Sequence, residues 1–358
     1  MTLTVGMAIY KEFDGVWPTV KGLKMNHADD IDEIIVVDNQ PDCDEGNLTR
    51  RFCKKAGVKY IPFDQQHGTA QPRNEVFRQS TSDYTLCIDP HVQLESGMLR
   101  DLKQFLGRND HQDDLVQGPM IGDNGQPIGT HQDPVWRGQA KGIWCRGGKE
   151  CVHNFHEHQG SNPHDDPFTI DQQGMGFFAA RTESWIGFHP DFRGFGGCES
   201  YVAEMYRRRG NRVICLPSQR WHHKTTRVAG TPYPNHLTDR LSNYMITADA
   251  LGWDKSDLLS GFCYDLDEAN RAAVMAWLQN RVHAETIPTP AAARQRTEIV
   301  GRCPHPSFRS KVDIRRWETE GVMNYGVATI AIVCGDCGEH LRFANHTDGM
   351  FIVKPPEP

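Results

Sequence analysis

The sequence predicts an α/β protein with a mostly parallel sheet, because strand-like apolar runs alternate with helical segments along its first hundred residues. Glu33-Ile-Ile-Val-Val37 is a continuous apolar run, which is typical of a strand buried on both faces. The run from Tyr84 to Ile88 looks buried in the same way. Helices on both faces of the sheet would cover these two strands completely.

The other elements follow in order along the chain. Further strands are expected at residues 2–9, 59–62 and 212–216, and helices at residues 16–26, 48–56, 72–79, 200–209 and 265–283. Regular structure of unspecified type is expected at residues 174–181. Pro72 stands near the first turn of its helix, where a proline is well tolerated, and Gly210 is placed to stop the helix that ends at Arg209. Asp38-Asn-Gln-Pro-Asp42, which follows the first buried run, is rich in turn formers.

The chain is expected to divide into a large domain, residues 1–285, and a small module, residues 302–346. Residues 286–301 have the composition of a linker, and residues 347–358 form a tail. Within the large domain, residues 111–172 are dominated by Gly, Pro, His and Asp. So long a segment with few periodic apolar residues is typical of a lid or a binding region.

Composition excludes several classes of protein. With 358 residues, of which 38% are hydrophobic, the chain can bury a core, and its net charge of −7 at pH 7 provides no general basic field for nucleic acid. The N-terminus lacks the basic segment of a signal peptide, and no stretch approaches the roughly 20 apolar residues that span a bilayer. The 11 cysteines indicate thiols and metal ligands rather than disulfides. We therefore expect a cytoplasmic protein with no membrane partner.

Asp89 and His91 are the most informative residues of the chain. They directly follow the strand that ends at Ile88, and the carboxyl ends of parallel strands are where open α/β sheets bind ligands. A carboxylate and an imidazole at this place could hold a divalent cation, Mn²⁺ or Mg²⁺, against a diphosphate. An Asp-x-His pair also occurs by chance, so its neighbours decide its meaning.

Three further features point to the same edge of the sheet. Asp38 ends the other buried strand and could accept hydrogen bonds from a base or a ribose, or it could cap a turn. Arg73 and Asn74 lie at the start of a helix, where a phosphate could bind, although a solvated helix start would look alike. His222 and His223 follow a later strand, and one of them could complete a metal site.

Cysteine and histidine spacing predicts a separate structural zinc in the small module. Cys303 and His305 form one pair of ligands, and Cys334 and Cys337 form the other. A module of this size has little core of its own, so a bound Zn²⁺ would supply much of its stability. The alternative is a set of unrelated buried cysteines. The histidine-rich segment 151–164 could bind a second metal or form a polar lid.

These elements resemble, over roughly residues 1–230, the GT-A fold of nucleotide-sugar-dependent glycosyltransferases. Residues 33–39 resemble the strand and aspartate that contact the nucleotide in that family, and Arg73-Asn74 resembles its arginine–asparagine pair. Asp89-Pro-His91 is similar to the metal motif of polypeptide N-acetylgalactosaminyltransferases. Met175-Gly-Phe-Phe-Ala179 and Phe195-Gly-Gly-Cys-Glu199 are similar to two further motifs of those enzymes.

The resemblance also implies roles for two downstream residues. The family has a metal-binding histidine six residues after a proline, and His223 stands six residues after Pro217. When the motifs are aligned on their glycines, the family's glutamate falls on Cys198 and its asparagine on Glu199. Counting back from Gly210 instead places Glu199 where inverting relatives have their catalytic base. Glu199 is therefore the expected acceptor-side acid, and inversion or retention stays open.

The implied function is transfer of a sugar from a nucleotide sugar, expected to be a UDP-sugar, to a hydroxyl group. Asp89, His91 and His223 would hold Mn²⁺ or Mg²⁺, and Asp38 and Arg73 would grip the nucleotide. A GT-A enzyme with a zinc ribbon is similar to phage TET-associated glycosyltransferases, which modify 5-hydroxymethylcytosine in DNA.

A phage DNA acceptor would place this chain in the host cytoplasm. Arg207 to Arg209, Lys311 and Arg315-Arg316 offer local positive charge for DNA phosphates, and Trp136, Trp144 and Trp221 could stack on an extruded base. A transferase acting on protein or glycan, in the virion or the host, is the alternative. A non-catalytic binding protein on the same fold is the third possibility.

Overall fold

The computed structural model describes residues 1–65, 68–108, 113–122, 125, 127–131, 160, 162–224, 232–253, 255–264, 266–285, 308–319, 322–334 and 340–343. Contacts between Cα atoms divide the chain into two compact units, Met1–Asp265 and Leu266–Pro358. In the described part of the chain, no helix is both long enough and apolar enough to cross a bilayer.

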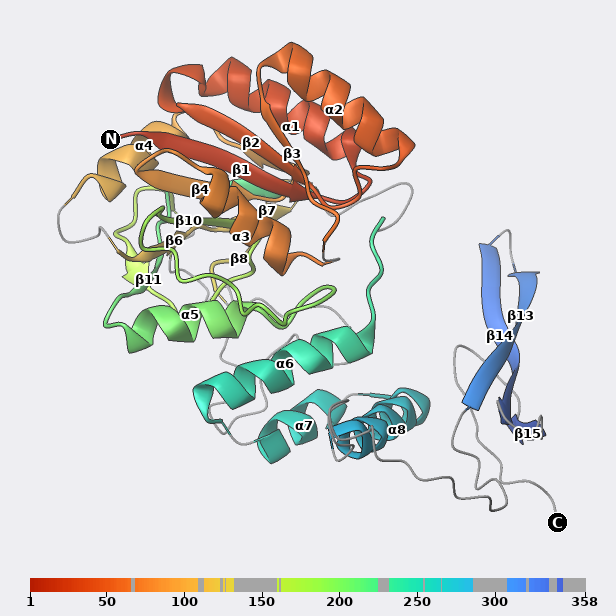
Figure 1. Ribbon diagram of the computed structural model, residues 1–358. Helices are drawn as coiled ribbons and strands as arrows, with labels where there is room; N and C mark the ends of the chain where they lie inside the picture. Colours follow the sequence, from red (N-terminus) through yellow and green to blue (C-terminus); the bar gives the residue numbers. More distant parts are fainter. Residues whose placement is uncertain are drawn as a thin grey trace, which may run out of the picture. The chain divides into compact units, whose positions relative to one another are not determined.

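An eight-stranded sheet forms the centre of the first unit, with the strand order β3-β2-β1-β4-β10-β6-β11-β9. Figure 1 labels β1, β2, β3 and β4 of this sheet. The strands are β1 (Leu3–Ile9), β2 (Glu33–Asp38), β3 (Lys59–Pro62), β4 (Tyr84–Ile88), β6 (Leu115–Gln117), β9 (Phe168–Thr169), β10 (Phe177–Arg181) and β11 (Val213–Cys215). β3, β2, β1 and β4 pair in parallel, whereas β10 and β9 run antiparallel to their neighbours. The predicted α/β fold is confirmed, with a mixed sheet in which the strands β3, β2, β1 and β4 are parallel.

Helices cover both faces of this sheet. Figure 1 shows α1 (Phe13–Asn26) and α2 (Asp44–Ala56) together on one side, and the hydrophobic core there also includes α4 (Met98–Leu106). The other face packs against α3 (Ala70–Gln79) and α5 (Glu199–Arg208). β2 contributes Ile34 and Val36 to the first core, and Ile35 and Val37 to the second. This alternation explains why its sequence is apolar throughout.

A small second sheet lies in the same unit, with the order β5-β12-β7-β8. Its strands are β5 (Val92–Leu94), β7 (Met120–Gly122), β8 (Pro127–Gly129) and β12 (Trp221–His223). The sequence analysis missed β6, β7, β8 and β9, which all lie in the segment expected to be a lid, because strands of two or three residues show no readable periodicity. Residues 132–159 of that segment lie outside the described residues.

The remaining described elements of the first unit are η1 (Ala28–Asp30), α6 (Leu237–Leu251) and α7 (Lys255–Tyr264). The second unit contains α8 (Glu268–Glu285) and a three-stranded antiparallel sheet of β13 (Phe308–Thr319), β14 (Val322–Cys334) and β15 (His340–Phe343). The helix expected at residues 265–283 is confirmed as α8. Of the predicted zinc ligands, Cys303, His305 and Cys337 lie outside the described residues, and Cys334 ends β14 with its side chain undescribed. The zinc site stays a prediction.

Candidate active site

A cavity of about 620 Å³ opens at the carboxyl ends of β1, β2 and β4. Its walls include Ile9, Asn39 and Asp89 from these strand ends, and Arg73 from α3. Further lining residues come from two later segments of the chain: Arg193, Gly194, Phe195, Tyr233, Pro234, His236 and Asp239. The cavity therefore lies at the sheet edge where the sequence predicted a ligand site.

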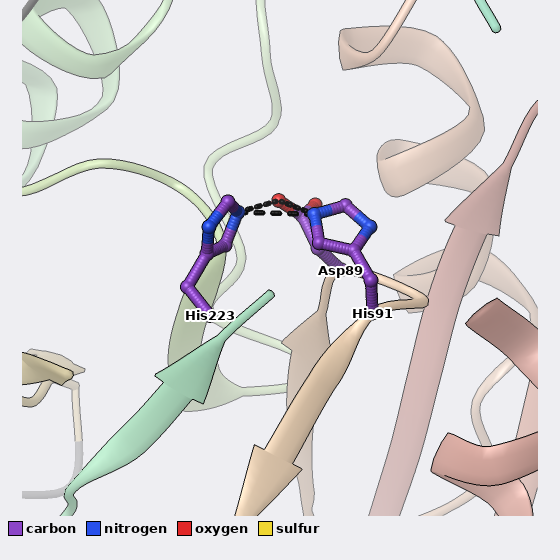
Figure 2. A group of neighbouring side chains, drawn as sticks. All are labelled: Asp89, His91 and His223. Atoms are coloured by element: carbon purple, nitrogen blue, oxygen red, sulfur yellow. Dashed lines mark hydrogen bonds and ion pairs between the residues drawn. The ribbon is translucent and has the colours of Figure 1, made fainter. Parts of the chain in front are cut away.

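Asp89, His91 and His223 converge on one point of this region (Figure 2). One ligand atom from each residue lies within 4.8 Å of the other two. The two imidazole Nε2 atoms are 3.0 Å apart, and Oδ2 of Asp89 is 3.9 Å from each of them. Two ligands bound about 2.1 Å from one cation, roughly at right angles, are separated by about 3 Å. The histidine pair thus has the spacing of ligands to a shared divalent ion.

Strand pairing decides which histidine belongs to this group. β12 pairs antiparallel with β5, and His223 stands opposite Val92, the residue after His91. Because side chains alternate along a strand, His222 points away, and its Nε2 lies 3.0 Å from Oε1 of Glu95. The choice between His222 and His223, which the sequence left open, therefore falls on His223.

Arg73 is paired with Asp89. Its guanidinium donates to Oδ1 of the carboxylate at 2.6 Å, and Arg73 is only 6% exposed. Burial alone would raise the pKa of Asp89, but the charge of Arg73, aided by His91 and His223, holds that pKa below its usual value. Asp89 is thus kept ionised with its second oxygen directed to the histidines.

Glu12 is a site residue that the sequence analysis missed. Its Oε1 lies 2.8 Å from Nδ1 of His91, and Glu12 also lines the cavity. Both residues are 7% exposed. The one feature of the sequence that could have indicated Glu12 is its position as an acidic residue between a buried strand and the helix that follows it.

Asp38 lies one layer behind the cavity wall. Its side chain is fully buried, accepts from the Tyr60 hydroxyl at 2.8 Å and from the backbone N–H of Gln40 at 3.0 Å, and does not line the cavity. Burial raises the pKa of Asp38, against these hydrogen bonds. Asn39, the next residue, reaches the cavity instead and is held by Gly68 N–H and the Phe63 carbonyl.

Asn74 braces the loop after β10 and is not on the cavity wall. Its Oδ1 accepts from the indole of Trp185 and from the backbone N–H of Phe188, at 3.1 and 2.8 Å. Its amide donates to the carbonyl oxygen of Phe188 at 3.1 Å. Of the predicted Arg73-Asn74 pair, only Arg73 faces the site.

Glu199 is buried at the start of α5 and is 6% exposed. It does not line the cavity, and its Oε2 has no hydrogen-bond partner in the structure. Burial raises the pKa of Glu199, although Arg73 and Arg240 act to lower it. A carboxyl group with a raised pKa is suited to accept a proton.

Part of the cavity wall is an aromatic pair whose role the sequence analysis did not predict. Phe195 and Tyr233 stack with ring centroids 5.1 Å apart, and both line the cavity. α6 holds the Phe195 loop in place: the amide of Asn243 donates to the carbonyl oxygens of Arg193 and Gly196 at 2.7 and 2.8 Å. Gly194 is packed so tightly against Asp239 that a Cβ atom would lie 2.6 Å from its Oδ2.

A comparison with protein families identifies the N-terminal half of the chain. Residues 4–178 match the model of Glycosyl transferase family 2. This part, just under half of the chain, is therefore similar to a glycosyltransferase family 2 domain. This match spans β1 to β10 and so contains Asp38, Arg73, Asp89 and His91.

Several solved glycosyltransferases are similar in structure to this chain, and the first of them has a TM-score above 0.5. The crystal structure of GalNAc-T7 with UDP, GalNAc and Mn²⁺ is similar with a TM-score of 0.55 and 11% identity, covering 97% of this chain and 72% of that one. The mannosyltransferase PcManGT from Pyrobaculum calidifontis, in complex with GDP-Man and Mn²⁺, has a TM-score of 0.47 and 17% identity, covering 81% and 77%. The crystal structure of S. aureus TarS 1–349 has a TM-score of 0.45 and 15% identity, and the match covers 83% of this chain and 76% of that one. No curated protein sequence matches. These findings show a glycosyltransferase with the GT-A fold.

One expectation for the acceptor side of the glycosyltransferase is corrected. Trp221 cannot stack on an extruded base, because it is 1% exposed and its indole donates to the Gly118 carbonyl at 2.7 Å. Arg207 and Arg208 both form ion pairs with Glu204, and Arg209 is exposed, so phosphate binding by these arginines stays a prediction. Trp136 and Trp144 lie outside the described residues, and no side chain of Lys311, Arg315 or Arg316 is described.

Proposed function

We propose that this glycosyltransferase moves a sugar from a UDP-sugar to a hydroxyl acceptor with the aid of Mn²⁺ or Mg²⁺. The observation that carries the proposal is the convergence of Asp89, His91 and His223 beside the cavity. Carboxylate oxygen and imidazole nitrogen suit both ions, and a bound cation would neutralise the developing charge of a diphosphate leaving group. The crystal structure of GalNAc-T7, whose fold is similar, contains UDP and Mn²⁺.

Other residues of the site are proposed to bind the nucleotide, to support the cavity wall and to activate the acceptor. Arg73 keeps Asp89 ionised and oriented, and Asn39 and Glu12 line the cavity beside them. We propose that Asp38 and Asn74 support nucleotide binding from one layer behind, since they hold the segments that carry Asn39 and Arg73. Glu199 is proposed as the acceptor-side acid and general base, supported by its raised pKa and its unpaired Oε2.

The proposed acceptor is 5-hydroxymethylcytosine in phage DNA, which would place the enzyme in the host cytoplasm. This part of the proposal rests on the resemblance to phage TET-associated glycosyltransferases and on the C-terminal Cys and His spacing that predicts a zinc ribbon. The exposed Arg193 on the cavity wall provides one positive charge for a phosphate. Glycosylation of a protein or glycan would use the same donor-side residues.

The decisive experiment uses mass spectrometry of nucleosides. DNA containing 5-hydroxymethylcytosine is incubated with the full chain, Mn²⁺ and a pool of UDP-sugars, and the Asp89→Ala variant serves as the control. A sugar-sized mass increment on the modified base, absent with the variant, would support both donor and acceptor. Release of UDP without any change in the DNA would retain the transferase mechanism and move the acceptor to protein or glycan. Absence of both would overturn the proposal.

A further inference from the structure

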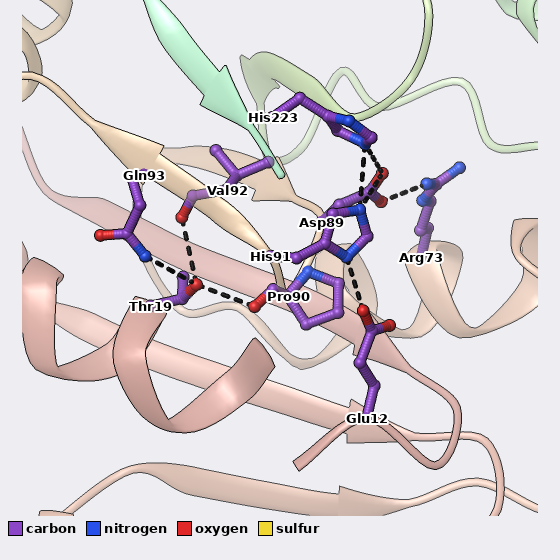
Figure 3. A network of polar contacts seen from close by, with 9 residues as sticks. All are labelled: Glu12, Thr19, Arg73, Asp89, Pro90, His91, Val92, Gln93 and His223. Carbon is purple, nitrogen blue, oxygen red and sulfur yellow. Dashed lines mark hydrogen bonds and ion pairs between the residues drawn. The ribbon is translucent and has the colours of Figure 1, made fainter. Parts of the chain in front are cut away.

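We infer that Glu12 is a positioning residue that holds His91 in the tautomer and orientation needed to bind the metal ion. The inference deepens the proposed function, since it rests on the same metal site. Figure 3 shows Glu12 approaching His91 on the side of the ring opposite to His223 and Asp89. The carboxylate therefore contacts the histidine without occupying the place of the metal.

The tautomer follows from hydrogen-bond chemistry. An ionised carboxylate can only accept, so Nδ1 of His91 carries a proton and donates it to Oε1 of Glu12 across 2.8 Å. A neutral imidazole with its proton on Nδ1 has a free lone pair on Nε2. Nε2 is the atom that faces His223 at 3.0 Å and Asp89 at 3.9 Å. Glu12 thus leaves the metal-binding nitrogen of His91 available.

The local backbone is arranged for this contact rather than for helix capping. Glu12 occupies the N-cap position of α1, where Ser, Thr, Asp and Asn are preferred, yet its side chain makes no capping hydrogen bond. Lys11 before it has φ of 50°, the one non-glycine residue with positive φ in the described part of the chain. Such a conformation is unfavourable and persists where surrounding contacts impose it. Where Glu12 turns toward His91, α1 therefore lacks a side-chain N-cap and Lys11 adopts an unfavourable backbone conformation.

α1 also holds the turn that carries the ligands. The Thr19 hydroxyl donates to the carbonyl oxygen of Pro90 at 2.8 Å and lies 3.1 Å from that of Val92. Gly15 packs so closely on the same turn that a Cβ atom would lie 2.8 Å from the Pro90 oxygen. α1 therefore holds the backbone on either side of His91 through Thr19, while Glu12, before the helix, contacts the His91 ring (Figure 3).

Charge gives Glu12 a second effect. Asp89 is already paired with Arg73, so the charges of these two groups largely offset one another at the metal site. Glu12 places a carboxylate one imidazole ring away from the proposed cation position, on the far side of the ring that would bind the ion. Loss of such a partner typically weakens metal binding by about 10–100-fold.

The test measures Mn²⁺ affinity without nucleotide or acceptor, by titrating free Mn²⁺ in electron paramagnetic resonance spectra. Glu12→Gln keeps the size of the side chain and removes its charge; we expect at least about tenfold weaker Mn²⁺ binding. Glu75→Gln is the matched control, because the Glu75 side chain is 8% exposed against 9% for Glu12 and bonds Arg78 instead. An affinity within about twofold of the unaltered protein in Glu12→Gln would overturn the inference.

A second measurement needs no variant and remains valid if Glu12→Gln does not fold. Long-range ¹H–¹⁵N spectra of the metal-free protein at a pH where His91 is neutral report which ring nitrogen carries the proton. We expect Nδ1–H, and an Nε2–H tautomer would contradict the role of Glu12. Failure of the unaltered protein to bind Mn²⁺ would overturn the proposed metal site as well as this inference. Normal Mn²⁺ binding that Glu12→Gln leaves unchanged would overturn only the role of Glu12.

Discussion

Arg73, at the start of α3, donates to Asp89, at the end of β4, across 2.6 Å. The two residues are buried to different degrees: the side chain of Arg73 is 7% exposed and that of Asp89 is 20% exposed. The pair therefore joins a helix on one face of the sheet to the strand end that carries the metal motif. Arg73 is nearly inaccessible to solvent, whereas Asp89 is partly exposed and directs its Oδ2 toward His91 and His223.

Removal of Arg73 should destabilise the protein and make its stability depend on metal. Arg73→Met leaves the Asp89 carboxylate without its buried partner, a change that costs about 3–5 kcal/mol when the pair is fully buried and less at this partly open site. Added Mn²⁺ should recover more stability in Arg73→Met than in the unaltered protein, because the cation replaces the lost charge. Urea unfolding with and without Mn²⁺ measures both effects, and equal Mn²⁺ effects in the two proteins would contradict this account.

The two adjacent histidines should respond very differently to substitution. His223→Ala removes a proposed metal ligand and is expected to lower Mn²⁺-dependent UDP release by at least about tenfold. His222→Ala removes only a contact with Glu95 near the surface, so its activity should stay within about twofold. Initial rates over a range of Mn²⁺ concentrations make the comparison. Equal losses in both variants would mean that the β5–β12 register is different in solution.

Glu199→Gln should lower the turnover rate without changing the affinity for Mn²⁺. Loss of a general base typically lowers turnover by about 10²–10⁴-fold. Mn²⁺ affinity should not change, because Glu199 is not among the three metal-site residues. Steady-state rates and Mn²⁺ titrations test this, and a turnover close to that of the unaltered protein would remove Glu199 from the mechanism.

The same variant makes a pH prediction for stability. Burial raises the pKa of Glu199 in the folded protein, so its contribution to stability is fully present below the ordinary glutamate pKa and is lost as the pH rises through the raised value. Glutamine has no such loss. Glu199→Gln should therefore gain stability relative to the unaltered protein from mildly acidic to neutral pH. Thermal unfolding as a function of pH gives the difference, and a constant offset would count against a raised pKa.

Thr19 should matter for the shape of the ligand turn. Thr19→Val leaves the buried carbonyl oxygens of Pro90 and Val92 without this donor, which should cost about 1–3 kcal/mol. Thr49→Val is a matched control, since the Thr49 hydroxyl is also buried but donates to a carbonyl within its own helix. Chemical denaturation should show a larger loss for Thr19→Val, and only this variant should bind Mn²⁺ more weakly. Equal behaviour of the two variants would argue against a clamp by α1.

Metal analysis should distinguish the two predicted ions. The full chain purified without added metal is expected to retain Zn²⁺ held through Cys337, and Cys337→Ser should remove it. Asp89→Ala should leave the zinc content unchanged and abolish Mn²⁺ binding. Inductively coupled plasma mass spectrometry measures the zinc. Loss of zinc in Asp89→Ala, or its retention in Cys337→Ser, would refute the assignment of separate sites.

Much of the fold was predictable because its signals are local. β4 was predicted at Tyr84–Ile88 and β3 at Lys59–Pro62, and both have those bounds in the structure. The helix predicted from Pro72 begins earlier, at Ala70. The short strands β6 to β9 were missed, since they are defined by pairing with distant partners rather than by their own pattern.

The sequence by itself determined that Asp89 and His91 follow a buried strand, because hydrophobic runs and the order of strands and helices are encoded along the chain. Only the tertiary structure decided that His223 rather than His222 joins them, since a shift of one residue in the β5–β12 register would exchange the two side chains. It also decided the place of Glu12, which reaches His91 only because β1 and β4 lie side by side in the sheet. Contacts between distant segments depend on packing, and packing leaves no local pattern from which they can be predicted.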